Sequence, residues 1–189
     1  MLIYLHGFNS SPLSHKAQVL RQYLSARGLE RCYSCPALSH EPRQAIDAVE
    51  AEISRHEKPL TFIGSSLGGF YATYLAEKHD TRAILINPAI HPHVDLRAYL
   101  GEQQNLHSGE RYELTERHLD QWAELYVADI KSERYLLIVE TGDEVLDYHA
   151  AMQRYAGARQ FVIEGGDHSL QSFPRYLDLI ARFAGLKQC

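Results

Sequence analysis

Short apolar runs alternate with amphipathic helical segments along most of this 189-residue chain. A continuous apolar run is typical of a strand buried on both faces, and its alternation with helices is typical of a parallel sheet. The sequence therefore predicts an α/β fold with a short six-stranded, mainly parallel sheet and helices on both faces. The expected strands are Leu2–Leu5, Arg31–Cys35, Leu60–Ile63, Arg82–Ile86, Tyr135–Glu140 and Gln160–Glu164. The expected helices are Ser14–Ala26, Glu41–His56, Leu67–Lys78, Asp147–Tyr155 and a last one that opens near Ser169.

One segment, His91–Ile130, interrupts this alternation with polar, histidine-rich sequence and a single helical piece near Leu119–Ala128. An insertion of this length between two strands is usually functional. We expect it to form a small cap over the carboxyl ends of the strands. It is too short and uneven to be a second domain, so residues 1–189 are expected to fold as a single domain, in agreement with the chain length.

Charge and apolar patterning exclude two classes of partner. The chain has 19 basic and 24 acidic residues and a net charge of −5, whereas proteins that bind a phosphate backbone usually carry a basic surplus. No apolar stretch approaches the roughly 20 residues that a membrane-spanning helix needs. The N-terminus also lacks the basic region of a secretory signal peptide. We therefore expect no nucleic-acid partner, no membrane span and a cytoplasmic location.

Cysteine and histidine spacings give weak signals for redox or metal chemistry. Cys32 and Cys35 form a Cys-x-x-Cys pair, which could be a redox motif or half of a zinc site. No second pair accompanies it and no helix pattern starts there, so a structural role is favoured. A second group of candidate ligands lacks the spacing of strong zinc sites. Its members are His91, His93, Asp95, His107 and His149. The sequence thus predicts neither a metal nor another cofactor.

The strongest functional signal is Gly64-x-Ser66-x-Gly68, which follows an apolar run and precedes a helical segment. This is the pattern of a nucleophile elbow, in which a serine occupies a strained strand-to-helix turn and the flanking glycines avoid steric collision. Ser65 is adjacent, but the two glycines flank Ser66 symmetrically, which makes Ser66 the candidate nucleophile. The alternative, a phosphate-binding turn, lacks the lysine of a P-loop and the spacing of a dinucleotide motif.

A serine hydroxyl needs a histidine base and an orienting carboxylate, and both follow the serine along the chain in elbow-type hydrolases. His168 follows the last expected strand, and catalytic groups of open parallel sheets gather at that carboxyl edge. Asp143 comes directly after the glycine that ends the preceding strand, so it is the preferred acid. Glu144 and Asp147 are alternatives on the same turn, although Asp147 is better placed to cap the next helix. Asp167 is expected to shape the histidine loop.

Stabilising the oxyanion of acyl transfer requires preorganised N–H donors. One is expected from Leu67, the residue after the nucleophile, and the other from the loop that follows the first strand. In that loop Gly7 allows the backbone to approach, and Phe8 is the expected donor. His6 is expected to brace the loop rather than to act as a second base.

Together these residues resemble the α/β-hydrolase superfamily, and more narrowly the small bacterial esterases of the YqiA/YcfP type. The segments that carry the resemblance are Tyr4–Pro12, Ser14–Ala17, Gly64–Ala72, Asn87–Ala89, Thr141–Asp147 and Gly165–His168. The resemblance implies Ser66 as nucleophile, Asp143 as acid and His168 as base, with hydrolysis of carboxylic esters or acyl thioesters. It also implies that the two leading antiparallel strands of the fold are absent here. The exposed sheet edge that this leaves makes a homo-oligomer an open expectation, since exposed edges tend to be covered.

Three functions follow as hypotheses. The first is a serine esterase that acts on small-molecule esters of small to medium acyl groups, through an acyl-enzyme and without a cofactor. The second is an acyl-CoA thioesterase, which would use the same triad on a thioester. The third is a non-catalytic binding protein, because a fold does not fix a function. The intact set of Ser66, Asp143 and His168 weighs against the third.

Overall fold

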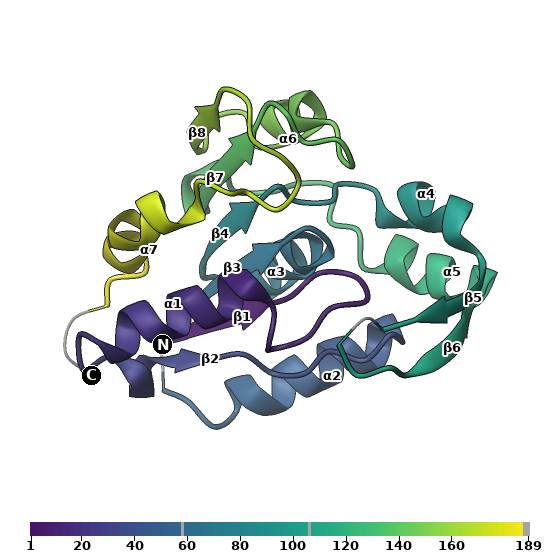
Figure 1. Cartoon of the computed structure of the whole chain (residues 1–189), viewed down its shortest axis with the longest axis horizontal. Helices are drawn as coiled ribbons and strands as arrows, with labels where there is room; N and C mark the ends of the chain where they lie inside the picture. Colours follow the sequence, from purple (N-terminus) through teal and green to yellow (C-terminus); the bar gives the residue numbers. More distant parts are fainter. Residues whose placement is uncertain (58, 106, 187–189) are drawn as a thin grey trace.

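The computed structural model describes residues 1–57, 59–105 and 107–186, and its centre is a six-stranded sheet (Figure 1). The strands lie in the order β2-β1-β3-β4-β7-β8, and every neighbouring pair is parallel, which confirms the predicted sheet. Their bounds are Leu2–Leu5 (β1), Tyr33–Ser34 (β2), Thr61–Ser65 (β3), Arg82–Ile86 (β4), Tyr135–Glu140 (β7) and Arg159–Ile163 (β8). The predicted bounds of β1, β4 and β7 coincide with the observed ones.

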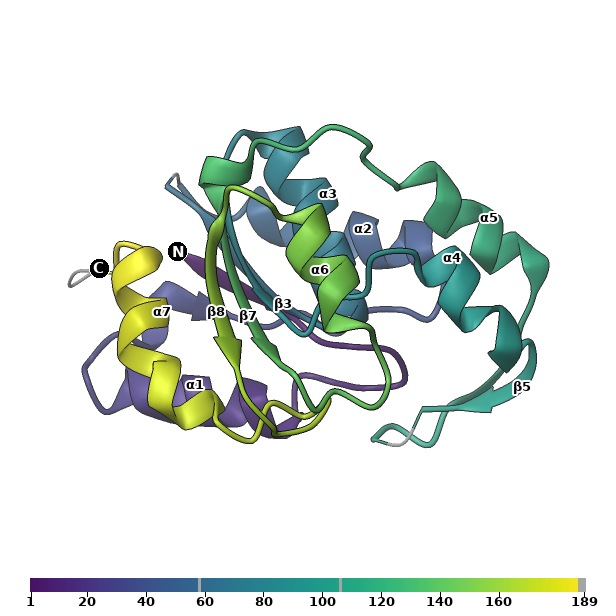
Figure 2. The same ribbon diagram turned by 90° about the horizontal axis from the view of Figure 1, so that it is seen from above.

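Helices cover both faces of this sheet, as predicted (Figure 2). The helices of one face are α1 (His15–Ser25) and α7 (Leu177–Phe183), and those of the other are α2 (Pro42–Ile53), α3 (Leu67–His79) and α6 (Tyr148–Arg154). Successive strand residues point to opposite faces. Leu2 and Tyr4 therefore pack with α1 and α7, whereas Ile3 and Leu5 pack with α2, α3 and α6. Two apolar cores hold the sheet between them.

Most of the other bounds shift by one to three residues, and two expected elements are also preceded by 3₁₀ turns. The predicted strand Arg31–Cys35 begins as a 3₁₀ turn, Glu30–Cys32, and only Tyr33–Ser34 pairs with β1. Pro36 lacks an N–H for the ladder and ends the pairing soon afterwards. The last helix begins at Leu177 rather than near Ser169, after a 3₁₀ turn at Phe173–Tyr176. Leu170 adopts a left-handed φ of 51°, which delays the start of the helix.

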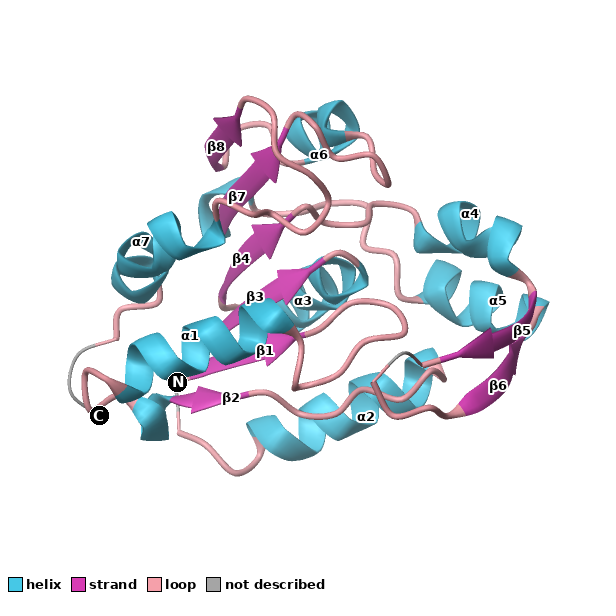
Figure 3. Cartoon of the chain, in the orientation of Figure 1, coloured by secondary structure: helices cyan, strands magenta, loops and turns pink. Residues whose placement is uncertain are grey.

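The insertion holds more regular structure than the sequence predicted. It contains α4 (Pro92–Asp95), a 3₁₀ turn (Leu96–Tyr99), an antiparallel hairpin of β5 (Gly101–Gln104) and β6 (Arg111–Leu114), and α5 (Glu116–Glu124). The hairpin was not predicted, and α5 begins three residues before the expected helical piece because Thr115 and His118 form a capping box. These elements lie beyond the carboxyl ends of β1 and β3, where a cap was predicted (Figure 3). Position 106 of the insertion and positions 187–189 of the predicted domain lie outside the described residues.

The cap is attached to the body through α5. Trp122 is fully buried, and its indole N–H donates to the hydroxyl of Tyr71 in α3 at 2.7 Å. The carboxamide oxygen of Gln121 accepts the backbone N–H of Arg43 in α2 at 3.1 Å. These contacts fix the cap against two helices on the same face of the sheet. Among the helices that the structure describes, none combines the length and apolar character needed to cross a bilayer.

Candidate active site

Ser66 lies between the end of β3 and the start of α3, and its φ is 56°. A left-handed φ is costly for a residue with a Cβ, so the turn is strained. The glycines on either side allow it to close. A Cβ on Gly64 would overlap the carbonyl of Gly68, and a Cβ on Gly68 would overlap the carbonyl of Leu5. The structure thus places Ser66 on the sharp turn that the sequence pattern predicted, whereas Ser65 is a buried residue of β3.

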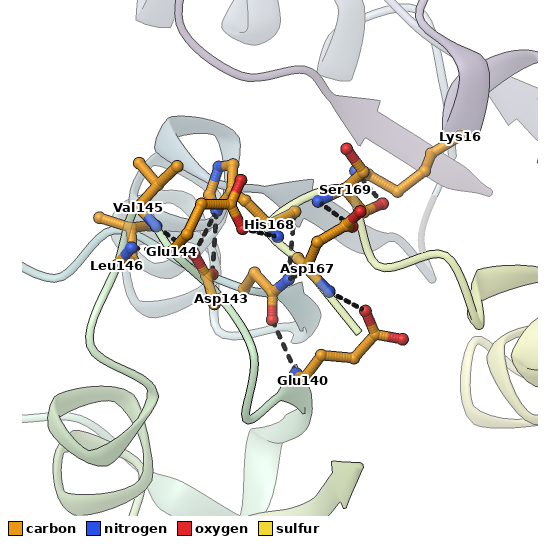
Figure 4. A network of polar contacts seen from close by, with 10 residues as sticks. Lys16, Glu140, Asp143, Glu144, Val145, Leu146, Asp167, His168 and Ser169 are labelled. Carbon is orange, nitrogen blue, oxygen red and sulfur yellow. Dashed lines mark hydrogen bonds and ion pairs between the residues drawn. The ribbon is translucent and has the colours of Figure 1, made fainter. Parts of the chain in front are cut away.

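His168 and Asp143 are directly paired. The imidazole Nδ1 lies 3.0 Å from Oδ1 and 2.9 Å from Oδ2 of Asp143 (Figure 4). Oδ1 also accepts the backbone N–H groups of Val145 and Leu146, both at 2.9 Å. The side chain of Asp143 is 2% exposed and that of His168 is 22% exposed. Burial alone raises the pKa of Asp143, but hydrogen bonds from His168, Leu146 and Val145 outweigh it and hold the pKa below its ordinary value.

The other acidic residues of these loops have different partners. Glu144 accepts the backbone N–H of His168 through Oε2 at 3.0 Å. Asp147 caps α6 by accepting the N–H of His149 at 2.9 Å. Asp167 accepts the N–H of Ser169 at 2.9 Å, which shapes the loop as predicted. Of the carboxylates considered from the sequence, Asp143 is the one whose oxygens contact the imidazole of His168.

Ser66 and His168 line the same cavity of about 600 Å³, together with Phe8 and Leu67. The cap contributes Pro92, Asp95, Leu96 and Tyr99 to its walls. Tyr99 also contacts the ring of Phe8 edge to face, with a centroid distance of 6.3 Å. The cavity therefore has a floor formed by the elbow and a side wall formed by the cap.

The loop after β1 passes directly beside the candidate nucleophile. A Cβ on Gly7 would lie 3.3 Å from the Cβ of Ser66, so a larger residue here would require one of the two segments to shift by a few tenths of an ångström. His6 fixes the loop, because its Nε2 accepts the N–H of Leu38 at 3.1 Å while its Nδ1 lies 3.1 Å from the carbonyl of Gly7. Burial lowers the pKa of His6, which favours the neutral ring that these two bonds require. Leu67 is the first residue of α3, and its N–H therefore has no intrahelical acceptor.

Two buried residues of this region were assigned no role from the sequence, although Asn87 lies in one of the segments that carry the resemblance. Asn87 follows β4 and is 2% exposed, and Glu140 ends β7 and is 1% exposed. Both side chains bind the loop that carries His168. A signal was available for Glu140, because a charged residue that closes an otherwise apolar run at a catalytic sheet edge needs a specific polar partner.

A family model described as "Uncharacterised protein family (UPF0227)" matches residues 1–185. The chain belongs to the UPF0227 family. A UPF0227 protein of Pectobacterium carotovorum is 27% identical over 193 residues, which cover 98% of this chain and 99% of the relative. The YcfP protein of Salmonella paratyphi A is 25% identical over 190 residues, with 98% and 99% coverage. The predicted resemblance to YcfP-type proteins is confirmed.

Solved structures place this UPF0227 chain in the α/β-hydrolase fold. Mouse alpha/beta hydrolase domain-containing protein 10 has a TM-score of 0.74 and 18% identity, with 96% of this chain and 89% of that chain covered. Est1E of Butyrivibrio proteoclasticus, solved with ferulic acid bound, has a TM-score of 0.70 and 16% identity, with 96% and 86% covered. At these identities the likeness establishes the fold, as the sequence predicted.

One group of side chains in the described part of this UPF0227 protein has donor atoms close enough to share a metal ion, namely His40, Glu41 and His118, within 4.8 Å of one another. The Nδ1 of His118 accepts the backbone N–H of Thr115, so its Nε2 carries the proton of the neutral ring. That Nε2 faces Oε1 of Glu41 at 3.4 Å. A metal-binding histidine instead donates its second N–H to an acceptor. The donor set therefore fits a histidine–glutamate pair that attaches α5 to the start of α2.

The Cys-x-x-Cys motif is not bridged within itself, because Cys35 carries a free thiol. Burial is the main cause that raises the pKa of Cys35 to about 12. The thiolate, which is the form active in redox exchange, is therefore scarce at neutral pH. A role for Cys35 in redox exchange is therefore disfavoured.

We expect Asp143 to stabilise the fold at neutral pH and to lose this contribution as the pH falls. A carboxyl whose folded pKa is depressed adds stability above its unfolded pKa, near ~3.9, and loses it as the pH falls through the folded value. Asp143→Asn removes this contribution. We expect urea unfolding between pH 7 and pH 3 to show that the wild-type protein has a larger free energy of unfolding than Asp143→Asn, and that this difference becomes smaller toward pH 3. A difference that stays constant would contradict the depressed pKa of Asp143.

Proposed function

We propose that this UPF0227 protein is a serine hydrolase of carboxylic esters, with Ser66 as nucleophile, His168 as general base and Asp143 as the orienting acid. The observation that carries the proposal is that His168, which is paired with the buried Asp143, lines the same cavity as Ser66. A strained serine and an imidazole in one cavity, with a buried carboxylate that orients the imidazole, are the parts that acyl transfer needs.

In the first half of the reaction, the Oγ of Ser66 attacks the ester carbonyl carbon as Nε2 of His168 takes its proton. The oxyanion that forms accepts hydrogen bonds from the N–H groups of Leu67 and Phe8. The tetrahedral intermediate then collapses, the bond to the leaving alcohol breaks, and His168 returns the proton to that oxygen. Asp143 remains ionised because its pKa is low, and its charge stabilises the imidazolium.

In the second half, a water molecule attacks the acyl-enzyme and gives a proton to His168. The second tetrahedral intermediate then collapses and releases the carboxylic acid. His168 returns its proton to the Oγ of Ser66, which restores the hydroxyl. The tautomer that this cycle requires is set by Asp143, because Nδ1 donates to its carboxylate and leaves the lone pair of Nε2 free.

The structural neighbours support ester chemistry for the proposal. One of them is the monoacylglycerol lipase of Paleococcus ferrophilus, with a TM-score of 0.69 and 14% identity over 97% of this chain and 93% of that chain. Another was solved with ferulic acid, a small aromatic acid, in place. We extend this to esters of small to medium acyl groups, which a cavity of about 600 Å³ can hold. An acyl-CoA thioester would pass through the same steps with a thiolate leaving group, so aryl esters and acyl-CoA esters should be assayed side by side.

The direct test is reaction with a fluorophosphonate probe. We expect one mole of probe to attach to each mole of protein, with Ser66 identified as the site by peptide mass spectrometry. Preincubation with EDTA should leave labelling unchanged, because no proposed step uses a metal. A folded protein that neither reacts with the probe nor hydrolyses any ester would support the non-catalytic alternative.

We expect the wall that the cap contributes to the cavity to set acyl-chain selectivity. Leu96 lines the cavity, whereas Leu100, four residues later, is 38% exposed and outside the lining. We expect Leu96→Trp to fill part of the cavity and to lower kcat/KM for the longest accepted acyl chain by about tenfold or more, with acetate esters little affected. Leu100→Trp is the matched control and should keep the wild-type chain-length profile. Equal profiles for both variants would place selectivity away from this wall.

A further inference from the structure

The loop that carries His168 (residues 164–172) is held by side chains of neighbouring strand ends. It leaves β8 through Gly165 and Gly166, whose φ angles are 76° and 74°. It then returns toward α7 across the carboxyl ends of the central strands (Figure 3). Loop backbone that lies on a protein body in this way needs partners for its N–H and C=O groups. Here several of those partners are side chains that are remote in sequence.

We propose that Glu140 and Asn87 are positioning residues that hold the backbone of the His168 loop, and so set the imidazole between Asp143 and Ser66. This inference rests on the proposed function. Oε2 of Glu140 accepts the N–H of Asp167 at 2.9 Å, and Oε1 accepts the N–H of Ser172 at 3.1 Å. One carboxylate therefore binds the loop on both sides of His168.

The chemistry of this contact requires a carboxylate. Two backbone N–H donors converge on two different oxygens of Glu140, and a carboxamide offers only one oxygen. In a glutamine at this position the amide NH₂ would face one of the backbone N–H groups, which leaves two donors opposed. The loop also approaches closely, because a Cβ on Gly166 would overlap the carboxylate of Glu140.

Asn87 fixes the carbonyl side of the same loop. Its Nδ2 donates to the carbonyls of Asp167 and His168, both at 3.1 Å, and its Oδ1 accepts the N–H of Glu140 at 3.0 Å. Its φ of 38° lies in the left-handed region, which asparagine tolerates better than most residues. Asn87 thus joins the ends of β4 and β7 to the backbone of His168 itself.

Glu140 therefore contacts both the segment that carries Asp143 and the loop that carries His168. Asp143 follows Glu140 by three residues, and its N–H donates to the carbonyl of Glu140 at 3.2 Å. Figure 4 shows the carboxylate of Glu140 bonded to the backbone of Asp167, and Asp143 beside the imidazole of His168. Lys16 adds a further contact, from its ammonium to the carbonyl of Ser169 at 2.8 Å. The distance between Asp143 and His168 therefore depends on how Glu140 holds both segments.

The decisive variant is Glu140→Gln, compared with Glu164→Gln, which removes the same charge from an exposed position at the start of the loop. We expect Glu140→Gln to lower kcat by roughly 10- to 100-fold with little change in KM, by analogy with outer partners that orient metal-binding histidines. Glu164→Gln should retain wild-type kinetics. A Glu140→Gln enzyme with wild-type kcat, or an equal loss in both variants, would overturn the positioning role.

A spectroscopic readout separates positioning from general destabilisation. In wild-type protein the Nδ1 proton of His168, shared with Asp143, should give a proton NMR resonance downfield of the amide region that Asp143→Asn abolishes. We expect Glu140→Gln to shift or broaden this resonance while amide signals distant from the loop stay in place. An unchanged resonance would contradict the proposal. If Glu140→Gln changes the His168 resonance but the wild-type protein hydrolyses no ester, the proposed function is rejected and the positioning role is kept.

Asn87→Asp provides a second variant in case Glu140→Gln does not fold. Aspartate tolerates the same left-handed backbone and keeps an oxygen for the N–H of Glu140, but it cannot donate to the carbonyls of Asp167 and His168. We expect the same pattern of reduced kcat, steady KM and altered His168 resonance. Wild-type values for all three quantities would overturn the role of Asn87.

Discussion

Ser66→Ala is expected to reduce ester turnover by about 10⁴-fold or more, because the nucleophile of the acyl-enzyme is lost. The fold should be retained, since alanine and serine both carry a Cβ and meet the same strain at a φ of 56°. The rate is measured with aryl esters under saturating conditions, and folding is followed by circular dichroism and thermal unfolding. Covalent labelling by the fluorophosphonate should also disappear.

Ser65→Ala is the matched control for this substitution. Ser65 lines the same cavity as Ser66, but it is the last residue of β3 and does not occupy the strained left-handed turn. We expect the Ser65 variant to keep turnover within about tenfold of wild type and to label with the probe. If Ser66→Ala retained turnover within tenfold of wild type, the serine mechanism would be wrong and a metal-dependent reaction would have to be considered.

The parts of this site that could be predicted from the sequence are those with local causes. Two glycines at fixed spacing around Ser66 are required by contacts with Gly68 and Leu5, which recur wherever an elbow forms. The strand ends before Asp143 and His168 were visible as breaks after apolar runs. Because the carboxyl ends of parallel strands meet at one edge, that was enough to bring the two side chains together.

The parts that could not be predicted depend on contacts between distant segments. Asn87 meets His168 across 81 positions of sequence, and Glu140 meets Ser172 across 32 positions. No periodic pattern or short motif shows which segments these side chains contact, although the charge of Glu140 at the end of an apolar run indicates that it needs a polar partner. The β5–β6 hairpin was missed for a related reason: β5 alternates half-exposed with exposed residues and presents no continuous apolar run. A pattern search that looks for buried strands passes over such a hairpin.

Asp143→Asn is expected to lower kcat by about 10⁴-fold, close to the effect of losing the nucleophile. Asparagine keeps one oxygen that can accept the N–H groups of Val145 and Leu146, so the turn itself should survive. Its NH₂ group, however, would face Nδ1 of His168 in place of a carboxylate oxygen. The ring then favours the tautomer with its proton on Nε2, and that nitrogen can no longer take the proton of Ser66.

Asp147→Asn separates this effect from a general loss of charge on the same turn. Asp147 is 66% exposed at its side chain and caps α6, and asparagine is an equally good N-cap residue. The kcat of the Asp147→Asn variant should therefore stay within about twofold of wild type. The comparison is made by steady-state kinetics of both variants at one pH between 7 and 8. If Asp147→Asn were the crippled variant, the acid of the triad would have to be sought at the start of α6, and the hydrogen bond between Asp143 and His168 would be structural only.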